Sequence, residues 1–296
     1  MVSEEGTAIT CTSLTKYYGE FRGIENVDLS VEKGTIHGFL GPNGAGKTTT
    51  IRILVGLLKP TGGSATIFDQ PAGSLESRRK IGYLPSDFEL YSHYTVGEYL
   101  DFIESIRGSA PRRKELVNRF QLDEGRLCKD LSRGNRQKVG VVQAFMHDPE
   151  IVIADEPTTG LDPLMQEEFN KLLIEYTNNG GTVFLSSHIL AEVQEVCSHV
   201  TVIKEGSIVA TGKVDELLSQ VPRKAILRIS DVSVKQNLEQ NPQIKKIFSD
   251  GLTITVYYDS SAKDFLNSIP LDKIDDILLP PPTLEDYFLP IYQSEV

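Results

Sequence analysis

The sequence of 296 residues has little cysteine, and its histidines form no metal-binding pattern. The three cysteines, Cys11, Cys128 and Cys197, are odd in number and far apart, with no CxxC pair among them. A disulfide framework and a zinc site are therefore not expected. The five histidines lack the HExxH and HxH spacings, so a histidine-based metal centre is not expected either.

Positive charge and long apolar runs are also scarce. Lys and Arg number 30 against 41 Asp and Glu, which gives a net charge of −11 and disfavours a nucleic-acid partner. No run approaches the roughly 18–20 apolar residues that span a bilayer. Residues 1–5 are acidic and lack the apolar segment of a secretory signal. We therefore expect a cytoplasmic chain that cannot cross a membrane by itself.

Short apolar runs rich in β-formers alternate with helical stretches, which predicts an α/β fold with a parallel sheet. Residues 34–41, 151–154 and 182–185 read as buried strands that end in glycine or polar residues. Ligands bind at such carboxyl ends of strands in open α/β sheets. Residues 8–14 and 27–31 read as strands of a separate antiparallel piece.

The chain divides into a large and a small part. Residues of about 86–147 are mostly helical and have the pattern of a helical insertion into the large part. The composition changes near Val221-Pro222-Arg223, and two strand-like stretches follow, at 225–229 and 252–258. We therefore expect a domain of residues 1–221 and a small α+β domain of residues 222–296.

A glycine-rich loop lies between the first buried strand and an apolar helix expected to continue over 51–58. Residues 41–48 read GPNGAGKT and fit GxxxxGK[ST], the pattern of a phosphate-binding loop. Glycines let backbone N–H groups surround phosphates, and the following helix directs its positive dipole end at them. Lys47 supplies a charge for the β- and γ-phosphates, and the Thr48 hydroxyl can ligate Mg²⁺. The predicted nucleotide-binding set here is Asn43, Gly44, Ala45, Gly46, Lys47, Thr48 and Thr49.

A second part of the predicted nucleotide site follows the strand at 151–154, which ends in Asp155 and Glu156. Asp155 is placed to hold Mg²⁺, through water, and Glu156 to position or deprotonate an attacking water. Many buried strands end in an acid, so this signal is informative only together with the phosphate loop.

Over residues 7–220 the sequence resembles an ATP-binding cassette (ABC) ATPase. The matching motifs occur in the family's order: the phosphate loop, residues 131–138 (LSRGNRQK) resembling the LSGGQ signature, Asp155-Glu156, residues 159–162 (TGLD) resembling the D-loop, and His188 resembling the switch histidine. Tyr18 matches the aromatic residue that stacks on adenine. The resemblance implies a P-loop NTPase core of the ABC type, with an antiparallel β subdomain, a helical subdomain and a C-terminal α+β domain.

The resemblance further implies two cassettes packed head to tail, as a homodimer or as a heterodimer with a second cassette. Each ATP then lies between the phosphate loop of one copy and the signature of the other. Ser132 and the backbone of Gly134 would contact the γ-phosphate held by the partner, and Asp162 would communicate across the interface. His188 would contact the γ-phosphate in its own copy, with Glu156 and Lys47 as further catalytic residues.

Two positions depart from the family pattern. Ser86 stands where the family has a glutamine that touches the metal, so we assign Ser86 to the Mg²⁺ site and expect a water or Asp87 to make up the missing length. Our hypothesis is that Asp87 does not ligate Mg²⁺ directly. Arg133 and Asn135 replace Gly and Gln of the signature, but Ser132 and Gly134 are retained, so we still expect ATP hydrolysis.

These features predict the ATP-hydrolysing subunit of a membrane transporter, with ATP and Mg²⁺ as ligands and a polytopic permease as partner. The chain would be peripheral on the inner face of the cell membrane. Residues 282–289 (PTLEDYFL) resemble a stretch common in cassettes of ABC-2-type exporters, which favours export. The alternatives are a soluble ABC ATPase of translation or DNA repair, and a regulatory ATP-binding module. The single cassette and the acidic charge disfavour the first, and Glu156 disfavours the second.

Overall fold

The computed structural model describes residues 6–87, 89–231 and 233–293, which form two compact units. The first unit ends at Lys213 and the second begins at Val214. The boundary expected at residue 222 therefore falls inside the second unit, after its first helix. Within the described ranges, no helix has the length and apolar character needed to span a bilayer.

A six-stranded sheet forms the centre of the first unit. Its order is β10 (Ser207–Lys213), β9 (His199–Lys204), β3 (Ile36–Leu40), β8 (Thr182–Ser187), β7 (Ile151–Asp155) and β6 (Ile81–Leu84). All neighbouring strands are parallel except β9 and β10, and every residue of β3, β7 and β8 is buried. Parallel strands are covered on both faces, which explains why they read as continuous apolar runs. The predicted parallel sheet is confirmed.

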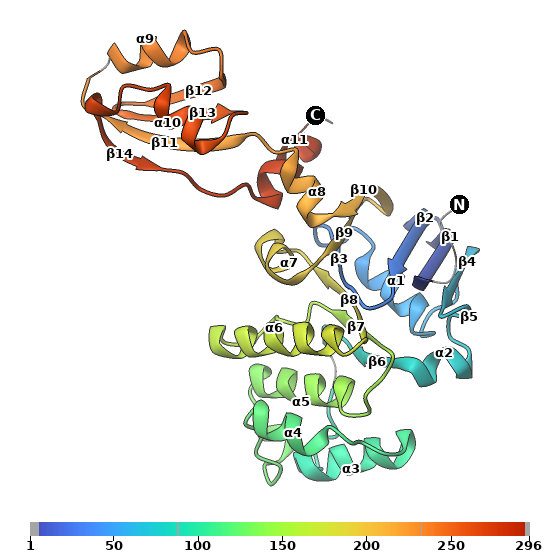
Figure 1. Ribbon diagram of the computed structural model, residues 1–296. Coiled ribbons are helices and arrows are strands. Elements are labelled where there is room, and N and C mark those ends of the chain that lie inside the picture. Colours follow the sequence, from blue (N-terminus) through green and yellow to red (C-terminus); the bar gives the residue numbers. More distant parts are fainter. Residues whose placement is uncertain (1–5, 88, 232, 294–296) are drawn as a thin grey trace. The chain divides into compact units, whose positions relative to one another are not determined.

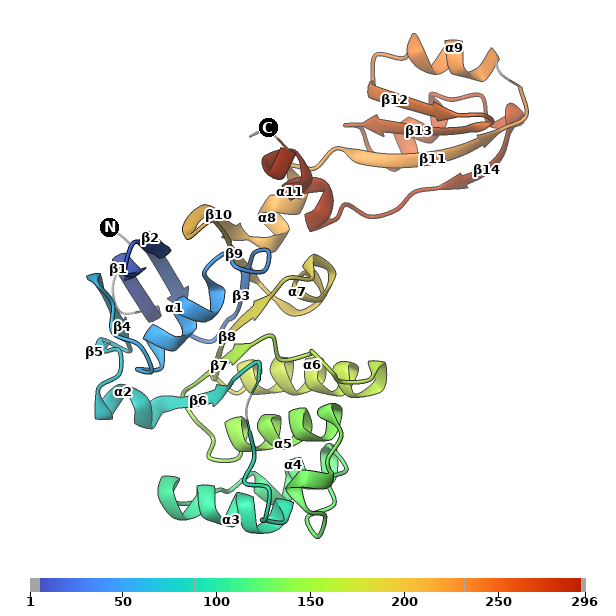
Figure 2. The ribbon, with the colours of Figure 1, turned by 180° about the vertical axis from the view of Figure 1, so that it is seen from behind.

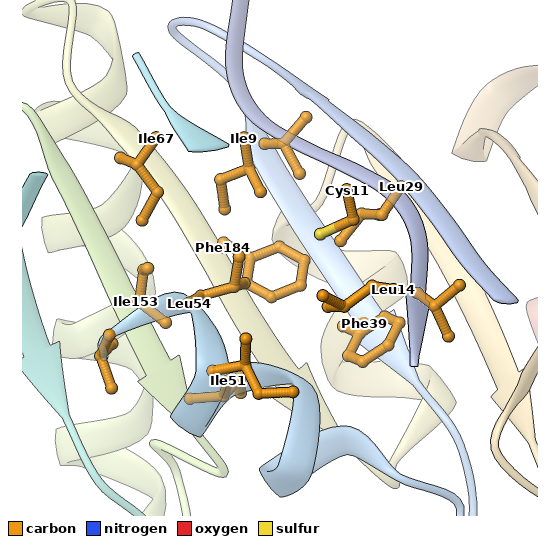
Figure 3. Packing of buried hydrophobic residues seen from close by; sticks show 14 of the residues in the cluster. Ile9, Cys11, Leu14, Leu29, Phe39, Ile51, Leu54, Ile67, Ile153 and Phe184 are labelled. Carbon is orange, nitrogen blue, oxygen red and sulfur yellow. The ribbon is translucent and has the colours of Figure 1, made fainter. Parts of the chain in front are cut away.

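An antiparallel sheet packs beside it, in the order β2 (Phe21–Glu32), β1 (Thr7–Tyr18), β4 (Gly62–Ile67) and β5 (Gln70–Pro71). One apolar core joins this sheet, helix α1 (Lys47–Leu54) and the central sheet. Figure 3 shows Ile9 and Leu14 of β1 packed with Phe39, Phe184 and Ile51 in that core. Burying side chains of this size contributes about 2 kcal/mol each, so the core fixes α1 against the sheet.

Helices account for most of residues 86–147, as expected. Three of them, α3 (Val96–Arg107), α4 (Arg113–Arg119) and α5 (Arg133–Phe145), lie together at one end of the first unit (Figures 1 and 2). The other helices of this unit are α2 (Leu75–Lys80), α6 (Pro163–Asn178) and α7 (Leu190–Val196), with a short 3₁₀ turn at Cys128–Asp130. The helical insertion thus brings α5, with the signature-like residues at its start, to the edge of the sheet at β6.

Helix α1 differs from its predicted extent, because it begins at Lys47 and ends at Leu54 rather than continuing to residue 58. Gly56 has φ 80° and packs so closely on Gly73 that a Cβ would lie 2.4 Å from the Gly73 Cα. The left-handed glycine stops the helix although the apolar pattern continues through Leu57 and Leu58.

The second unit contains a four-stranded antiparallel sheet in the order β12 (Ile244–Asp250), β13 (Thr253–Tyr258), β11 (Arg223–Ile229) and β14 (Ile274–Leu278). Its helices are α8 (Val214–Ser219), α9 (Ser233–Glu239), α10 (Ala262–Asn267) and α11 (Leu284–Gln293), with a 3₁₀ turn at Leu271–Lys273. The strands expected at 225–229 and 252–258 are β11 and β13. No strand is predicted from the sequence at β12 or β14, because each carries adjacent charged residues that break the apolar alternation.

Candidate functional site

The phosphate-binding loop connects the buried strand β3 to the first turn of α1. Gly44 and Gly46 have φ of 81° and 111°, a region that side chains with a Cβ avoid. A Cβ at Gly46 would also lie 2.5 Å from Ile24 Cγ2. The loop therefore requires glycine at Gly46, and it leads directly into the amino end of α1, where backbone N–H groups have no partner within the helix.

Lys47 is held inside this loop. Its ammonium donates hydrogen bonds to the carbonyl oxygens of Gly41 at 2.6 Å and Pro42 at 3.2 Å, and the residue is only 5% exposed. Glu156 Oε1 lies 3.3 Å from Lys47 Nζ. A buried cation at the amino end of a helix is suited to an anion with several oxygen atoms, such as a polyphosphate.

Thr48 and Asp155 face each other across the end of the sheet. The Thr48 hydroxyl donates to Asp155 Oδ2 at 2.8 Å, and the Ser186 hydroxyl donates to Asp155 Oδ1 at 2.6 Å. The parallel register of β7 and β8, which pairs Asp155 with Ser186, produces this contact. The Thr48 hydroxyl and the Asp155 carboxylate offer only oxygen atoms as metal ligands, so this pair fits a hard cation such as Mg²⁺.

The described residues do not form a metal centre whose ligands all come from the protein. No group of three or more His, Cys, Asp or Glu residues placed to hold a metal occurs in the described ranges. Mg²⁺ commonly uses one or two protein ligands together with waters and substrate phosphates, so Thr48 and Asp155 are a sufficient protein contribution.

Glu156 is positioned by an unusual backbone conformation. Its φ of 52° lies in the left-handed region, and its N–H donates to Ser186 Oγ at 3.0 Å. The His188 ring contacts the same side chain, with Nδ1 2.6 Å from Glu156 Oε2. Since an ionised carboxylate only accepts, His188 Nδ1 is the donor, and Nε2 is left for another partner. The Glu156 carboxylate thus contacts both the Lys47 ammonium and the His188 ring.

A cavity of about 460 Å³ opens beside these groups. Thr48 and Glu156 line it, and so do Ser86 and Asp87 from the segment after β6. The lining is completed by Thr159 and by three residues from the start of α5, namely Arg133, Arg136 and Gln137. The structure therefore brings Ser86 to the cavity that contains Thr48, while the roles of Ser86 and Asp87 remain predictions.

Tyr18 lies beside the phosphate loop. Its hydroxyl is 3.4 Å from Thr49 Oγ1, and the residue is 46% exposed. Gly23 leaves room for the ring, because a Cβ there would be 2.8 Å from Tyr18 Cε2. An exposed aromatic ring next to the loop is available for stacking on a flat base.

Ser132, Gly134 and Asp162 occupy a second region, at the starts of α5 and α6. Ser132 caps α5 by accepting from Asn135 N at 3.2 Å, and Asp162 caps α6 by accepting from Met165 N at 3.1 Å. Gly134 packs on the loop before α6, since a Cβ would lie 2.6 Å from the Gly160 carbonyl oxygen. No hydrogen bond or ion pair joins these three residues to Lys47 or Glu156 among the described contacts.

The sequence prediction omitted two residues that support the site. Ser186 bridges Asp155 and Glu156, and buried Gln137 donates from Nε2 to the Pro157 carbonyl oxygen at 2.7 Å. The signal for Ser186 was present, because it is a polar residue at the carboxyl end of a buried strand next to the strand of Asp155. Gln137 has no such signal, since a glutamine within a helix is usually solvent-exposed.

Comparisons with known proteins point to one family. A family model described as ABC transporter matches residues 24–159. The bacitracin transport ATP-binding protein BcrA of Bacillus licheniformis is 34% identical over 297 residues, which cover 96% of this chain and 96% of that protein. The ABC transporter ATP-binding protein YhaQ of Bacillus subtilis is 34% identical, over 75% of this chain and 77% of that protein.

Solved structures give the same result. An ATP-binding subunit of an ABC transporter has a TM-score of 0.67 and 30% identity, covering 72% of this chain and 93% of that chain. The dimeric post-hydrolysis cassette MJ0796, bound to ADP and Pi, has a TM-score of 0.64 and 26% identity, covering 70% and 98%.

Proposed function

Since the chain belongs to the ATP-binding proteins of ABC transporters, we propose that it energises an export-type permease through two composite ATP sites formed by paired cassettes. It is the ATP-hydrolysing subunit of such a system. One observation carries the assignment of the catalytic centre: Lys47, Glu156 and His188 are in contact beside the phosphate loop.

In this proposal, the loop amides and Lys47 bind the β- and γ-phosphates of ATP. Thr48 and Asp155 would hold Mg²⁺, with Ser86 contributing from the facing wall of the cavity. The metal, when bound, neutralises the charge that the phosphate oxygens share. Tyr18 stacks on the adenine next to Thr49.

Glu156 acts as the base that orients the attacking water and accepts its proton. The neighbouring Lys47 ammonium stabilises the carboxylate, and the left-handed backbone fixes where its oxygens lie. His188 donates from Nδ1 to Glu156 and uses Nε2 to contact the γ-phosphate. Both contacts orient groups before the reaction begins, which is how such sites lower the barrier.

The second copy completes each site. Ser132 of the partner subunit and Gly134 of the partner subunit lie at the start of a helix, where the dipole favours an anion. ATP then joins the two copies through its γ-phosphate, and hydrolysis removes that contact. The two copies are identical chains in our proposal, which makes the assembly a homodimer.

The variant Glu156→Gln tests this mechanism. We expect it to bind ATP as the native chain does and to lose turnover by about 10³-fold, because the amide cannot accept the water's proton. The trapped complex should elute as a dimer in size-exclusion chromatography only when ATP is present. Lys47→Ala is the control, and it should weaken nucleotide binding itself. An elution volume that ATP leaves unchanged for Glu156→Gln would contradict the paired-cassette site.

The permease is the second testable part. BcrA is named for bacitracin transport, and residues 282–289 resemble the tail of exporter cassettes, so we propose a polytopic export permease as the membrane partner. The chain would then reside on the cytoplasmic face of the membrane, bound through that permease. Detergent extracts purified on the tagged chain should contain one polytopic membrane protein in a fixed ratio. Recovery of ribosomes or DNA instead would support a soluble ABC ATPase.

A further inference from the structure

The sheet of the second unit has two faces of different character. Alternate residues of β11 and β13, such as Leu227 and Val256, form a core with α9 and α10 through Val234 and Phe265. Figure 2 shows α9 lying along one side of this sheet. The intervening residues of each strand point to the other face, because side chains alternate along a strand. No helix contributes to a core on that second face in the described part of the chain.

The strand register arranges this open face into rows. Phe248 pairs with Thr255, Thr255 with Ile226, and Ile226 with Leu278, so one mostly apolar row crosses all four strands. Phe248 and Leu278, at the two ends of the row, are each 59% exposed. The Phe248 ring packs edge-on against Tyr257 with centroids 6.0 Å apart. We call the four residues Phe248, Thr255, Ile226 and Leu278 the apolar row.

Charged residues flank the apolar row, acidic except for Arg228 on one side and basic on the other. On one side, the register pairs Asp250 with Thr253 and Arg228 with Asp276. On the other side, it pairs Lys246 with Tyr257 and Tyr257 with Lys224. Lys246 and Asp250 are exposed, and neither forms an ion pair with any residue that the structure describes. Two unpaired opposite charges on one edge strand, separated by Phe248, are suited to a partner with the same pattern reversed.

We propose that this face docks onto the same face of a second copy of the chain, about a two-fold axis that runs along the apolar row. The inference rests on the paired cassettes of the proposed function. Such an axis places each apolar row on its counterpart and brings Lys246 of each copy opposite Asp250 of the other. An axis parallel to the strands would instead bring Asp250 opposite Asp276, two acids. The charge pattern therefore selects the first arrangement.

One kind of like-charged contact remains in this arrangement, between Arg228 of one copy and Lys224 of the other, and the two-fold axis produces it twice per dimer. Each has an acidic neighbour in its own chain. Lys224 Nζ lies 3.4 Å from Asp286 Oδ1, and Arg228 is paired across the strands with Asp276. Their repulsion is therefore reduced within each copy before the two faces meet.

The area of the open face indicates under which condition it can hold two copies together. Four strands about 4.8 Å apart, with about five residues of roughly 3.3 Å each, make a face of roughly 300 Å². A stable interface buries about 800 Å² on each partner, so this face cannot hold two free chains together. When ATP has already joined the cassettes, docking becomes intramolecular, at an effective concentration that reaches the millimolar range for short linkers. The face then strengthens a dimer that ATP initiates.

The test measures the dissociation constant of the ATP-bound dimer by sedimentation velocity, using the full chain carrying Glu156→Gln. Lys246→Asp and Asp250→Lys, each alone, should raise that constant about tenfold, because each creates two like-charged contacts per dimer. The double variant Lys246→Asp/Asp250→Lys exchanges the charges and should restore the constant to within about twofold. Lys263→Asp is the matched control, since it makes the same charge change on α10, the helix that covers the opposite face.

Each outcome decides a separate point. A dimer that forms with ATP but is unchanged by both single variants overturns the docking face and leaves the proposed function standing. Loss in the single variants without recovery in the double variant overturns the two-fold arrangement. Absence of any ATP-dependent dimer overturns the paired cassettes and this inference with them.

A photoreactive benzoylphenylalanine in place of Phe248 identifies the occupant directly. In the complete complex with ATP, the expected product joins two copies of this chain, with the attachment mapped to β11–β14 of the second copy. An adduct with the permease or with another protein would overturn the proposal.

Discussion

Glu156 has a backbone conformation that few residues other than glycine adopt. A φ of 52° costs about 1 kcal/mol relative to the right-handed region, and the surrounding contacts must hold it. Ser186 is the central contact, because its hydroxyl accepts from Glu156 N and donates to Asp155 Oδ1. The geometry of both acids therefore depends on one serine.

Ser186→Ala tests this dependence. Removal of the hydroxyl takes one hydrogen bond from Asp155, which keeps Thr48, and one from the Glu156 N–H, which keeps the Ser186 carbonyl oxygen at 3.3 Å. It should lower the free energy of unfolding by about 1 kcal/mol for each bond lost. It should also lower kcat more than it changes KM for ATP, because the acids lose their orientation. Denaturant titration and steady-state ATPase assays measure the two effects. Ser198→Ala removes an exposed serine hydroxyl that donates to the Ile36 carbonyl oxygen, and it should change neither quantity; equal behaviour of the two variants would contradict the assignment.

At the scale of single residues, the sequence predicts the side chains expected to contact the nucleotide and misses those that hold these side chains in place. Lys47, Thr48, Asp155 and Glu156 were identifiable because each stands at or after the end of a buried strand in a known spacing. The structure brings them together in two contacting pairs, Lys47 with Glu156 and Thr48 with Asp155. Their catalytic roles remain predictions. The coupling of Ser186 to both acids depends on which strands are neighbours, and no local pattern contains that information.

At the scale of elements, the sequence specifies the first residue of helix α3 through its N-terminal cap. Thr95 Oγ1 accepts from Glu98 N at 3.2 Å, and Glu98 Oε2 accepts from Thr95 N at 2.7 Å. This reciprocal pair is a capping box, and it satisfies two backbone donors that the helix itself cannot.

Thr95→Ala should therefore lower the unfolding free energy of the first unit by about 1 kcal/mol. Thr95→Ser retains the oxygen and should recover most of that loss. Denaturant unfolding followed by circular dichroism compares the three proteins. A loss of equal size in the serine variant would show that the threonine methyl, rather than the cap, stabilises α3.

The starts of helices were predictable where caps mark them, but the end of α1 and the order of strands were not. Helix α1 ends where Gly56 contacts Gly73. These two residues are distant in the sequence, and the apolar pattern that continues through Leu57 and Leu58 does not indicate the contact. Strand β3 lies between β8 and β9, which come more than a hundred residues later in the chain. Such neighbours are decided by packing of the whole unit.

At the scale of the whole molecule, the stability of the first unit should depend on pH through His37. The residue is 3% exposed, its Nε2 lies 2.9 Å from Thr201 Oγ1, and its ring stacks on His199. Burial, with a smaller contribution from His199, lowers the pKa of His37 to about 3. The unfolded chain binds a proton at His37 below about pH 6.5, and the folded chain does so only near pH 3.

Stability from the neutral ring is therefore complete above about pH 6.5 and is lost as the pH falls toward 3. The loss through this one residue should be about 2 kcal/mol at pH 5. His37→Gln cannot titrate and keeps a hydrogen-bonding group near Thr201, so its unfolding free energy should fall less steeply between pH 7 and pH 5. Parallel curves for the two proteins in denaturant titrations at several pH values would rule out His37 as the source.

The three cysteines, noted first for their scarcity, have a practical consequence. All three are buried, and burial raises the pKa of each thiol, that of Cys11 to about 12. Since the thiolate is the reactive form, maleimides and oxidants should find no ready target on the folded chain. To such reagents it resembles a cysteine-free protein. A single cysteine introduced at the surface would thus carry a fluorophore or spin label alone, and distances between two copies during the ATP cycle can be followed without removing a native residue.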